Sequence, residues 1–550
     1  MSTPAPTPRA SLSWTALVGM GLAARVARRA ARLRDEAHWR DHAMRAQHET
    51  LRDLLTKAAG ARVGRDHDFA RIASIHDPAE RLAAYRKALP VRDWYVWREH
   101  ISQMRDEGRP DILWPGRVEL FAQTSGTTAG DKYIPVSKDM LRSNYLASLD
   151  IFAHLRNRGV SLARITSGKC LFLGGSTDLA VNQHGIKTGD LSGLVTPLIR
   201  WPISQIYSPG PDIALMNDWP AKIEAMAELT LTQDVRFISG MPSWALVLMQ
   251  RVLELAKERG RKGDRILDVW PNLEVFVHGG VKYAPFEPRV NQVFSGDKDT
   301  DLPQRIELYP ASEGFIAIQD REHEPAMRLL SDGGNFFEFV PLERIDDDDP
   351  EAFTADKVDK GQRYVVVLTT CAGLWRYNLG DVVEFDSIPT AIEGKKGDGP
   401  PRLRIVGRHR HFINAFGENI IVEHIEQAVA RAAADAGLTV GEFTAAPVYP
   451  AGGSRAALQL AVEIENKPGD EKLSRFATAF DAAIKAVNVD YTTKRSDDLG
   501  MGPPTITPIP PGSFHRWLES RGKLGGQHKC PRCANHRDII DSLLHVAGSQ

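Results

Sequence analysis

The sequence predicts an α/β protein with a large N-terminal domain of mixed β-sheets and packed helices, followed by a smaller α+β C-terminal domain. At 550 residues the chain exceeds what one hydrophobic core usually supports, so two or more domains are expected. Short apolar runs alternate with helical patterns through most of the chain, as in α/β layers. A charged Gly/Pro-rich segment, EGKKGDGPP at residues 393–401, interrupts this alternation and is typical of a linker.

The N-terminal region is predicted to be helical. An apolar stretch at residues 13–24 is followed by an arginine-rich stretch at residues 25–34. It is too short to span a bilayer, and the charges lie on the wrong side for a signal peptide. We expect a helix packed on its own domain, with a basic amphipathic helix at a membrane or partner surface as the alternative. Leu51, Leu54 and Leu55 then recur at helical spacing.

The first domain contains alternating strand and helix signals. A helix capped by Ser137 is expected, with Leu141, Tyr145, Leu149 and Phe152 on its apolar side. A second helix is expected from Ser243 to Gly260. Short strands are expected at residues 169–175, 234–240, 273–280, 305–314, 335–342 and 363–370.

Beyond the Gly/Pro segment the elements are consistent with a small α+β domain. The strand-like run LRIVGR comes first. The other expected elements are a helix at 422–436, a hairpin around 451–453, and helices near 471–487 and 536–546.

Composition limits the classes of function. Lys and Arg number 69 against 70 Asp and Glu, so the chain lacks the basic excess of a nucleic-acid-binding protein. The four cysteines are too few for a disulfide framework, which favours a reducing compartment. We therefore expect a cytoplasmic monomer that acts on small molecules, with no nucleic-acid partner and no stable membrane insertion.

The strongest local signal is the stretch FAQTSGTTAGDKYIPVS, Phe121 to Ser137. Its small residues, hydroxyls and single Lys132 suit a loop whose backbone N–H groups converge on phosphates. It is not a Walker A loop, because Asp131 separates Gly130 from the lysine. A flexible linker is the alternative, although strand-like runs at 118–121 and 133–136 bracket the loop.

The loop resembles the phosphate-binding loop of the adenylate-forming superfamily, approximately [ST]SGTTGxPK. Ala129 and Asp131 depart from that pattern. The flanking segments LWPG (113–116) and YIPVS resemble those of one branch, the Gretchen Hagen acyl-acid amido synthetases. The positions that match, and that the resemblance assigns to phosphate binding, are Thr124, Ser125, Gly126, Thr127, Thr128 and Lys132.

Two further motifs extend the resemblance. YPASEG resembles the superfamily element that makes Tyr309 an adenine contact, Ser312 a phosphate or carboxylate contact and Glu313 a Mg²⁺ ligand; a strand-end turn with a surface glutamate is the alternative. HGGVK resembles the glycine turn beside the base, at Gly279 and Gly280.

LWRYNLGDVVEF resembles the element whose aspartate, here Asp381, binds both ribose hydroxyls. The alternative, an ordinary Gly-Asp turn, explains only part of this run. TTCAGLWRYNLGD and NFFEFVP are also similar to the corresponding sequence segments of the amido synthetases.

The junction and tail complete the resemblance. GRHRHFINAFGENIIVEHIE, residues 407–426, is similar to the superfamily's hinge junction and implies that Arg408 binds the ribose, although Asn414 replaces the usual lysine. The tail KLGGQHKCPRC is similar to QYKTPRC and implies Lys529 as the catalytic lysine, with Lys523 as competitor. A zinc site would use His528, Cys530, Cys533 and His536, but one Cys-x-x-Cys pair is weak evidence for zinc.

The resemblance implies four regions: a helical extension at 1–45, an adenylate-forming domain at 46–395, a hinge linker at 396–407 and a mobile C-terminal domain at 408–550. It implies that a carboxylic acid attacks MgATP to give an acyl-adenylate and pyrophosphate, and that an amine such as an amino acid then displaces AMP. ATP and Mg²⁺ are the expected cofactors, and 171–177 with 239–244 the expected acyl pocket. An acyl-CoA ligase with a thiol acceptor and a nucleotide-binding non-enzyme are the alternatives.

Overall fold

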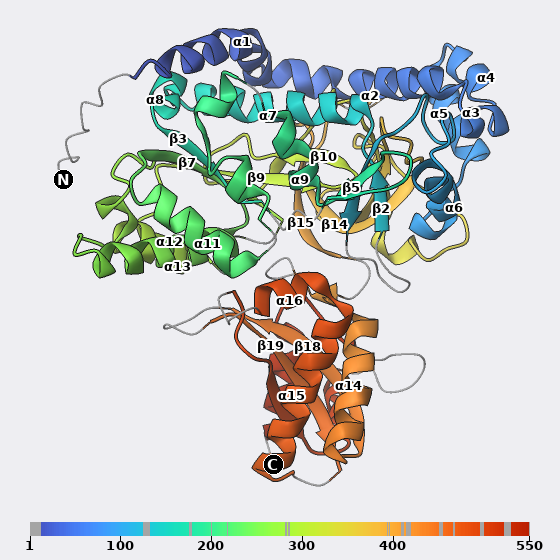
Figure 1. Ribbon diagram of the computed structural model, residues 1–550. Coiled ribbons are helices and arrows are strands. Elements are labelled where there is room, and N and C mark those ends of the chain that lie inside the picture. Colours follow the sequence, from blue (N-terminus) through green and yellow to red (C-terminus); the bar gives the residue numbers. More distant parts are fainter. Residues whose placement is uncertain are drawn as a thin grey trace.

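The chain folds into a large N-terminal body and a smaller C-terminal body (Figure 1). The computed structural model describes residues 13–124, 132–174, 179–199, 201–216, 218–280, 283, 286–392, 394, 396–408, 412–413, 418, 420–449, 455–465, 468–495, 500–521 and 530–548.

The large body is built on an 11-stranded sheet of order β12-β13-β14-β15-β11-β10-β9-β8-β7-β3-β6. The strands from β9 to β6 in this order are parallel, and those from β12 to β9 are antiparallel. The bounds are β3 (Lys169–Phe172), β6 (Tyr207–Ser208), β7 (Val235–Ser239), β8 (Val275–Gly279), β9 (Gln304–Ala311), β10 (Gly314–Ile318), β11 (Met327–Leu329), β12 (Phe336–Pro341), β13 (Arg363–Thr369), β14 (Tyr377–Ser387) and β15 (Arg402–Arg408). All six strands predicted in the first domain are present.

Helices cover both sides of this sheet, which confirms the predicted α/β layers (Figure 1). The upper layer in Figure 1 consists of α1 (Ala16–Arg34), α2 (Glu36–Ala58) and α7 (Lys138–Asn157), and the lower layer of α11 (Trp219–Thr230), α12 (Pro242–Glu258) and α13 (Glu287–Ser295). The other helices of the large body are α3 (Arg62–Asp66), α4 (Phe69–Ser74), α5 (Pro78–Ala88), α6 (Trp94–Arg105), α8 (Leu162–Thr166), α9 (Leu191–Val195) and α10 (Pro211–Ala214).

A second, four-stranded sheet of order β2-β1-β5-β4 contains the two strands that flank the small-residue loop in the sequence. Its strands are β1 (Leu120–Thr124), β2 (Lys132–Pro135), β4 (Ala180–Val181) and β5 (Lys187–Gly189). β1 and β2 are antiparallel and pair from Phe121 with Pro135 to Thr124 with Lys132. The predicted strands on both sides of the loop are therefore confirmed, whereas residues 125–131 lie outside the described part of the chain.

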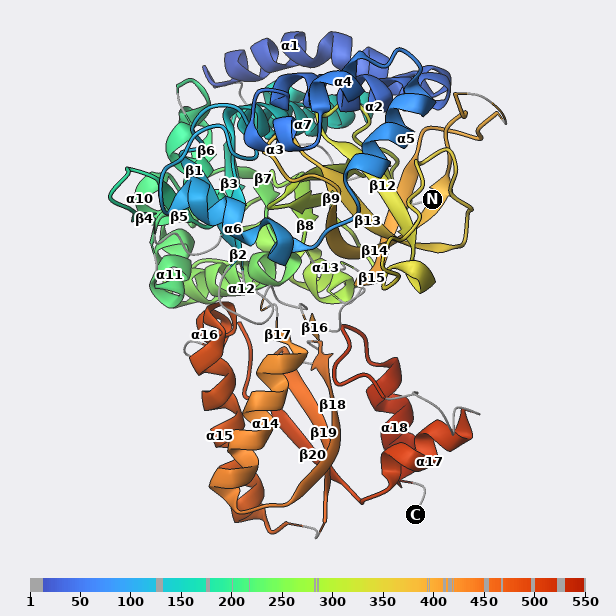
Figure 2. The same ribbon diagram turned by 90° about the vertical axis from the view of Figure 1, so that its right-hand side faces the viewer.

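The C-terminal body contains a three-stranded sheet, β18 (Val440–Val448), β19 (Ala457–Ile464) and β20 (Thr505–Ile509). α14 (Val422–Ala436) and α15 (Asp470–Val487) lie on one face, and α17 (Ser513–Ser520) and α18 (Asp538–Gly548) on the other (Figure 2). The short helix α16 (Val489–Arg495) lies at the end that faces the large body, near the short strands β16 (Phe412–Ile413) and β17 (Ile420–Ile421). The predicted helices and the predicted β18–β19 hairpin are confirmed.

The N-terminal helix packs on its own body, as expected. Val26, Ala30 and Leu33 of α1 are buried in a cluster with residues of α7 and α8. Arg29 forms ion pairs with Asp150 and Asp332, each at 2.6 Å. Because a guanidinium is always charged, the two carboxylates are what allow Arg29 to lie between α1 and the large body. No helix among the described residues is long and apolar enough to cross a membrane.

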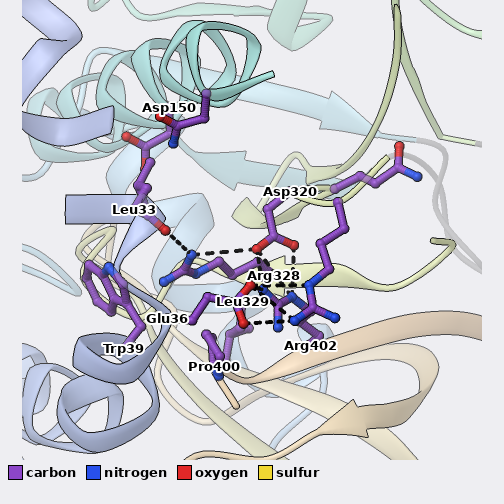
Figure 3. Close-up of polar contacts among 12 residues, drawn as sticks. Leu33, Glu36, Trp39, Asp150, Asp320, Arg328, Leu329, Pro400 and Arg402 are labelled. Atoms are coloured by element: carbon purple, nitrogen blue, oxygen red, sulfur yellow. Dashed lines mark hydrogen bonds and ion pairs between the residues drawn. The ribbon is translucent and has the colours of Figure 1, made fainter. Parts of the chain in front are cut away.

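The turn between α1 and α2 is fixed to the sheet by buried charges (Figure 3). Arg328 donates to the Leu33 carbonyl at 2.7 Å, and Arg402 donates to Asp320 and to Glu36. α2 continues without a break through residue 45, the predicted end of the extension. The two N-terminal helices are therefore integral to the large body.

Two helices differ in detail from the prediction. On α7 the buried side includes Met140, Ala147 and Ile151, whereas Tyr145 of the predicted apolar side is exposed. Leu141, Leu149 and Phe152 are half-buried and pack against the core, so the predicted face is confirmed except at Tyr145. The Tyr145 ring instead lies beneath the Arg25 guanidinium of α1, at 5.4 Å. α12 begins at Pro242 rather than at Ser243, since proline is well suited to the first turn of a helix.

The Gly/Pro-rich segment also differs from its predicted role. Residues 402–408, which were placed within or beyond the linker, form β15 between β14 and β11 of the large sheet. Asp398 accepts from Ile388 N at 2.8 Å, which ties the segment to the preceding strand. The Gly/Pro segment thus connects two neighbouring strands, and the chain leaves the sheet after Arg408, at the end of the predicted hinge at 396–407.

Candidate nucleotide site

The β9–β10 hairpin presents the YPASEG motif. Tyr309 lies in β9, and Ser312 and Glu313 form the turn before Gly314 pairs back with Ala311. Tyr309 is buried, and so is the Glu313 side chain. A buried turn carboxylate differs from the surface glutamate that was the alternative interpretation of this motif.

The glycine turn lies beside this hairpin. β8 runs parallel to β9 and ends with Gly279 opposite Leu308. A Cβ atom on Gly279 would lie 2.5 Å from the Leu308 carbonyl oxygen, and Gly280 has φ of +84°. Only glycine fits this close approach followed by a left-handed residue. Gly279 therefore brings the end of β8 against Leu308 and Pro310, the two neighbours of Tyr309 in the sequence.

Tyr309 and Asp381 meet in the structure. The Tyr309 hydroxyl donates to Asp381 Oδ2 at 2.7 Å, and both side chains are buried. Asp381 lies in β14 and is paired in register with Arg408 at the end of β15. Three residues that the motifs assigned to nucleotide binding thus come from separate strands of one sheet, although the Arg408 side chain lies outside the described part of the structure.

The strand that follows the small-residue loop is held against the same region by the start of α7. Ser137 Oγ accepts from Met140 N as the helix cap and donates to the Cys371 carbonyl at 2.5 Å. Asn335 Oδ1 accepts from Cys371 N, and the Asn335 amide lies beside Gly314 of the β9–β10 hairpin. The hairpin that ends at Thr124 and Lys132 is therefore braced on the segments that carry Glu313 and Asp381.

A buried ion pair joins two of the family-like motifs. Glu338 of β12 accepts from Arg376 Nε at 2.9 Å, and their side chains are 1% and 3% exposed. Arg86 adds a second contact at 2.8 Å. Burial alone would raise the pKa of Glu338, but the arginines outweigh burial and hold it below its ordinary value. This pair fixes the backbone of Arg376, whose φ is +42°, just before the strand that carries Asp381.

Sequence reasoning missed this pair. A lone glutamate within the apolar run NFFEFVP was the available signal, because a charged residue in a buried strand needs a partner. The LWPG segment also has a structural role, since the Leu113 carbonyl accepts a hydrogen bond from Trp375 Nε1 at 3.1 Å.

The predicted acyl pocket segments come together where both are described. Phe172 of β3 pairs with Ser239 of β7, and a Cβ atom on Gly240 would lie 2.7 Å from Leu173 Cβ. Residues 175–178 lie outside the described residues. The two segments therefore leave adjacent parallel strands at the same edge of the sheet, where α/β proteins place ligands.

Several predicted residues are not in the described part of the chain. These are Ser125, Gly126, Thr127 and Thr128 of the loop, and Lys523, His528 and Lys529 of the tail. Cys530 and Cys533 are free and buried, and burial raises the pKa of Cys530 to about 12. Within the described residues, no group of three or more His, Cys, Asp or Glu side chains is placed to hold a metal ion.

The fold is that of a solved acyl acid amido synthetase. The protein aligns with the solved structure of GH3.15 acyl acid amido synthetase over 92% of this chain and 94% of that chain, with a TM-score of 0.55 and 17% identity. At that identity the likeness shows the fold alone.

The chain belongs to the GH3 family. The GH3 family N-terminal domain matches residues 33–211 and 182–298, the central domain residues 328–393 and the C-terminal domain residues 423–538. The resemblance to the Gretchen Hagen family is thereby confirmed across most of the chain.

Curated relatives are amido synthetases. Indole-3-acetic acid-amido synthetase GH3.8 of Oryza sativa subsp. indica is 24% identical over 541 residues, covering 85% of each chain. Jasmonoyl--L-amino acid synthetase JAR4 of Nicotiana attenuata is 26% identical over 573 residues, covering 92% of this chain and 93% of that one. The match to indole-3-acetic acid-amido synthetase GH3.3 of Arabidopsis thaliana, 26% identical, spans 50% of this chain and 46% of the relative.

Proposed function

We propose that the protein is an AMP-forming acyl-acid amido synthetase. A carboxylate oxygen of the acid attacks the α-phosphate of ATP, the bond to pyrophosphate breaks, and an acyl-adenylate forms. The nitrogen of an amino acid then attacks the acyl carbon, AMP leaves, and an amide forms. Family membership and the full-length curated relatives support this reaction over thioester formation.

The observation that carries the proposal is the bond between Tyr309 and Asp381. It joins β9 and β14, two strands whose motifs were assigned to one nucleotide, at a buried position in the sheet. We assign Asp381 to the ribose hydroxyls, since a carboxylate accepts two hydrogen bonds. Tyr309 holds that carboxylate and lies with Gly279 and Gly280 beside the base.

The phosphates are assigned to the β1–β2 hairpin. Thr124 and Lys132 are paired where the two strands meet the loop, and Gly126 and the hydroxyl residues of 125–128 lie between them in the sequence. A lysine there offsets phosphate charge, and converging backbone N–H groups stabilise the charge that develops during attack. Ser312 is assigned to a phosphate or carboxylate oxygen, and Arg408 to the ribose.

Magnesium fits the residues assigned to it. Mg²⁺ is usually bound by one or two carboxylates together with substrate phosphates, and Glu313 supplies one buried carboxylate next to Ser312. When bound, the ion would neutralise phosphate charge. The chain's own contribution is to fix the Glu313 side chain in a two-residue turn between paired strands.

We assign the acid and the amine to chemical classes. The names of the relatives support an acid that carries a ring system and an amino acid acceptor. Ser239 to Trp244, at the end of β7 and the start of α12, contribute aromatic surface to the assigned acyl pocket. The four cysteines are free thiols, which supports a reducing, cytoplasmic compartment, and we propose a monomer.

The test is a pyrophosphate-release screen over ring-containing and aliphatic acids, followed by amino acid and coenzyme A panels for each acid that responds. We expect acid-dependent AMP and pyrophosphate, and amide products with an amino acid. Thioester formation without amide formation would instead support an acyl-CoA ligase. Nucleotide binding without pyrophosphate release for any acid would support a non-enzyme.

A further inference from the structure

A buried lysine of the C-terminal body contacts two tryptophans of the large body. Lys494 Nζ, in α16, lies 4.0 Å from the ring centroid of Trp244 and 4.4 Å from that of Trp219. The two indole rings lie at 57° to each other with centroids 4.9 Å apart. Lys494 is only 4% exposed. An ammonium held between two aromatic faces away from water is a strong form of cation–π contact.

The charges around this contact come from both bodies. Asp490 of α16 and Glu418 of the junction motif face Lys494 from its own body, and Asp190 and Lys222 face it from the large body. Burial lowers the pKa of Lys494 to about 8, so the amine is still protonated at neutral pH. Lys222 donates to the Ala214 carbonyl at 2.7 Å and is therefore held within the large body.

Within its own body, Lys494 lies near the carboxylates of Asp490 and Glu418. Among the described residues, no acceptor makes a hydrogen bond or ion pair with its ammonium group. By contrast, the neighbouring Arg495 binds Asp481 and the Met501 carbonyl, both in the C-terminal body. Among the described residues, the direct side-chain contacts of the Lys494 ammonium are therefore with the two indole rings of the large body.

We propose that Lys494, Trp219 and Trp244 form a docking contact that positions the C-terminal body for one of the two half-reactions. Trp244 belongs to the segment assigned to the acyl pocket, and Glu418 belongs to the junction that follows Arg408. The contact therefore connects the pocket wall to the segment where the chain leaves the sheet. The assignment of a half-reaction rests on the proposed function.

The proposal predicts unequal effects on the two half-reactions. Lys494→Ala removes the cation and its apolar stem, so the docked pose is populated less. We expect the ratio of the adenylation rate constant to the amide-formation rate constant to change by about tenfold. Lys494→Arg keeps a cation that stacks on indole rings and should restore the ratio.

Single-turnover kinetics of each half-reaction test this prediction, with pre-formed acyl-adenylate used for the second step. Lys485→Ala is the control, because the ion pair that Lys485 makes among the described residues is with Asp481 of its own body, at 2.7 Å. A changed ratio in Lys494→Ala that Lys494→Arg restores and Lys485→Ala lacks supports the contact. Equal slowing of both steps, or no change in either, overturns it.

Hydrogen–deuterium exchange of the full chain without substrates separates this inference from the proposed function. In Lys494→Ala, exchange should rise together at residues 219–230 and 489–495, and thermal unfolding should show that both bodies remain folded. A rise confined to 489–495 would show that Lys494 only supports its own helix, and would overturn the proposal. Absence of AMP formation in the unmodified protein would refute the function while leaving the exchange result valid.

Discussion

Replacing Tyr309 by Phe tests the nucleotide site at its central bond. The change removes one oxygen and keeps the ring, so the apolar packing of β9 is preserved. It deletes the 2.7 Å donor to Asp381 Oδ2, a hydrogen bond to a carboxylate in a buried setting. Such bonds are typically worth about 1.5–3 kcal/mol. If Asp381 must be held in place for the ribose, this loss corresponds to roughly 10- to 150-fold weaker ATP binding.

Isothermal calorimetry of ATP binding measures this effect directly. Tyr364→Phe is the matched control, because the Tyr364 hydroxyl accepts from Asp359 N at 2.8 Å and donates to Gln362, on the same sheet but at another location. The control should leave ATP affinity within about twofold. Unchanged affinity in Tyr309→Phe, or equal losses in both variants, would refute the assignment of Tyr309 and Asp381 to one nucleotide.

Three further changes give distinct expected results. Asp381→Ala should weaken ATP binding at least as much as Tyr309→Phe, and unchanged calorimetric affinity would reduce Asp381 to a turn residue. Glu338→Gln should lower the free energy of unfolding by roughly 3–5 kcal/mol at pH 7, because it leaves Arg376 buried without its carboxylate. Since folding lowers the pKa of Glu338, its stabilisation is present above the ordinary value of 4.5 and is lost as pH falls through the folded pKa, so denaturation curves of the two proteins should converge in acid. Lys529→Ala should abolish adenylation yet spare amide formation from supplied acyl-adenylate, and loss of adenylation in Lys523→Ala alone would shift the assignment.

Local patterns were sufficient to predict the regular elements. Each strand of the α/β sheet that the sequence predicted is a short apolar run between turn residues, and this signal does not depend on what the strand pairs with. The Ser137 cap was readable because a hydroxyl at that position satisfies a helix N–H locally. The fold class followed from the order of such elements.

Features that depend on distant partners could not be predicted in the same way. β15 looked like part of the linker region because its pairing with β11 and β14 is invisible in its own residues. The exposure of the Tyr145 side chain depends on where α1 packs against α7. Lys494 carries no sequence signal, since only the meeting of two bodies places it between indole rings.

The site residues show the same difference between local and distant signals. Resemblance supplied Tyr309 and Asp381, but their direct bond is a property of the folded sheet. The Glu338–Arg376 pair joins β12 to the residue just before β14, 38 positions away, and the lone glutamate does not indicate which residue is its partner. Motif residues could therefore be assigned from sequence, whereas the residues that hold them in place required the structure.

The most direct test of the central claim is the nucleotide product formed from ATP when an acid and an amino acid are supplied together. The protein should release AMP and pyrophosphate only when the acid is present, and an amide of that acid with the amino acid should accumulate in equal amount. Release of ADP and phosphate, or AMP formation that is independent of the acid, would contradict the account.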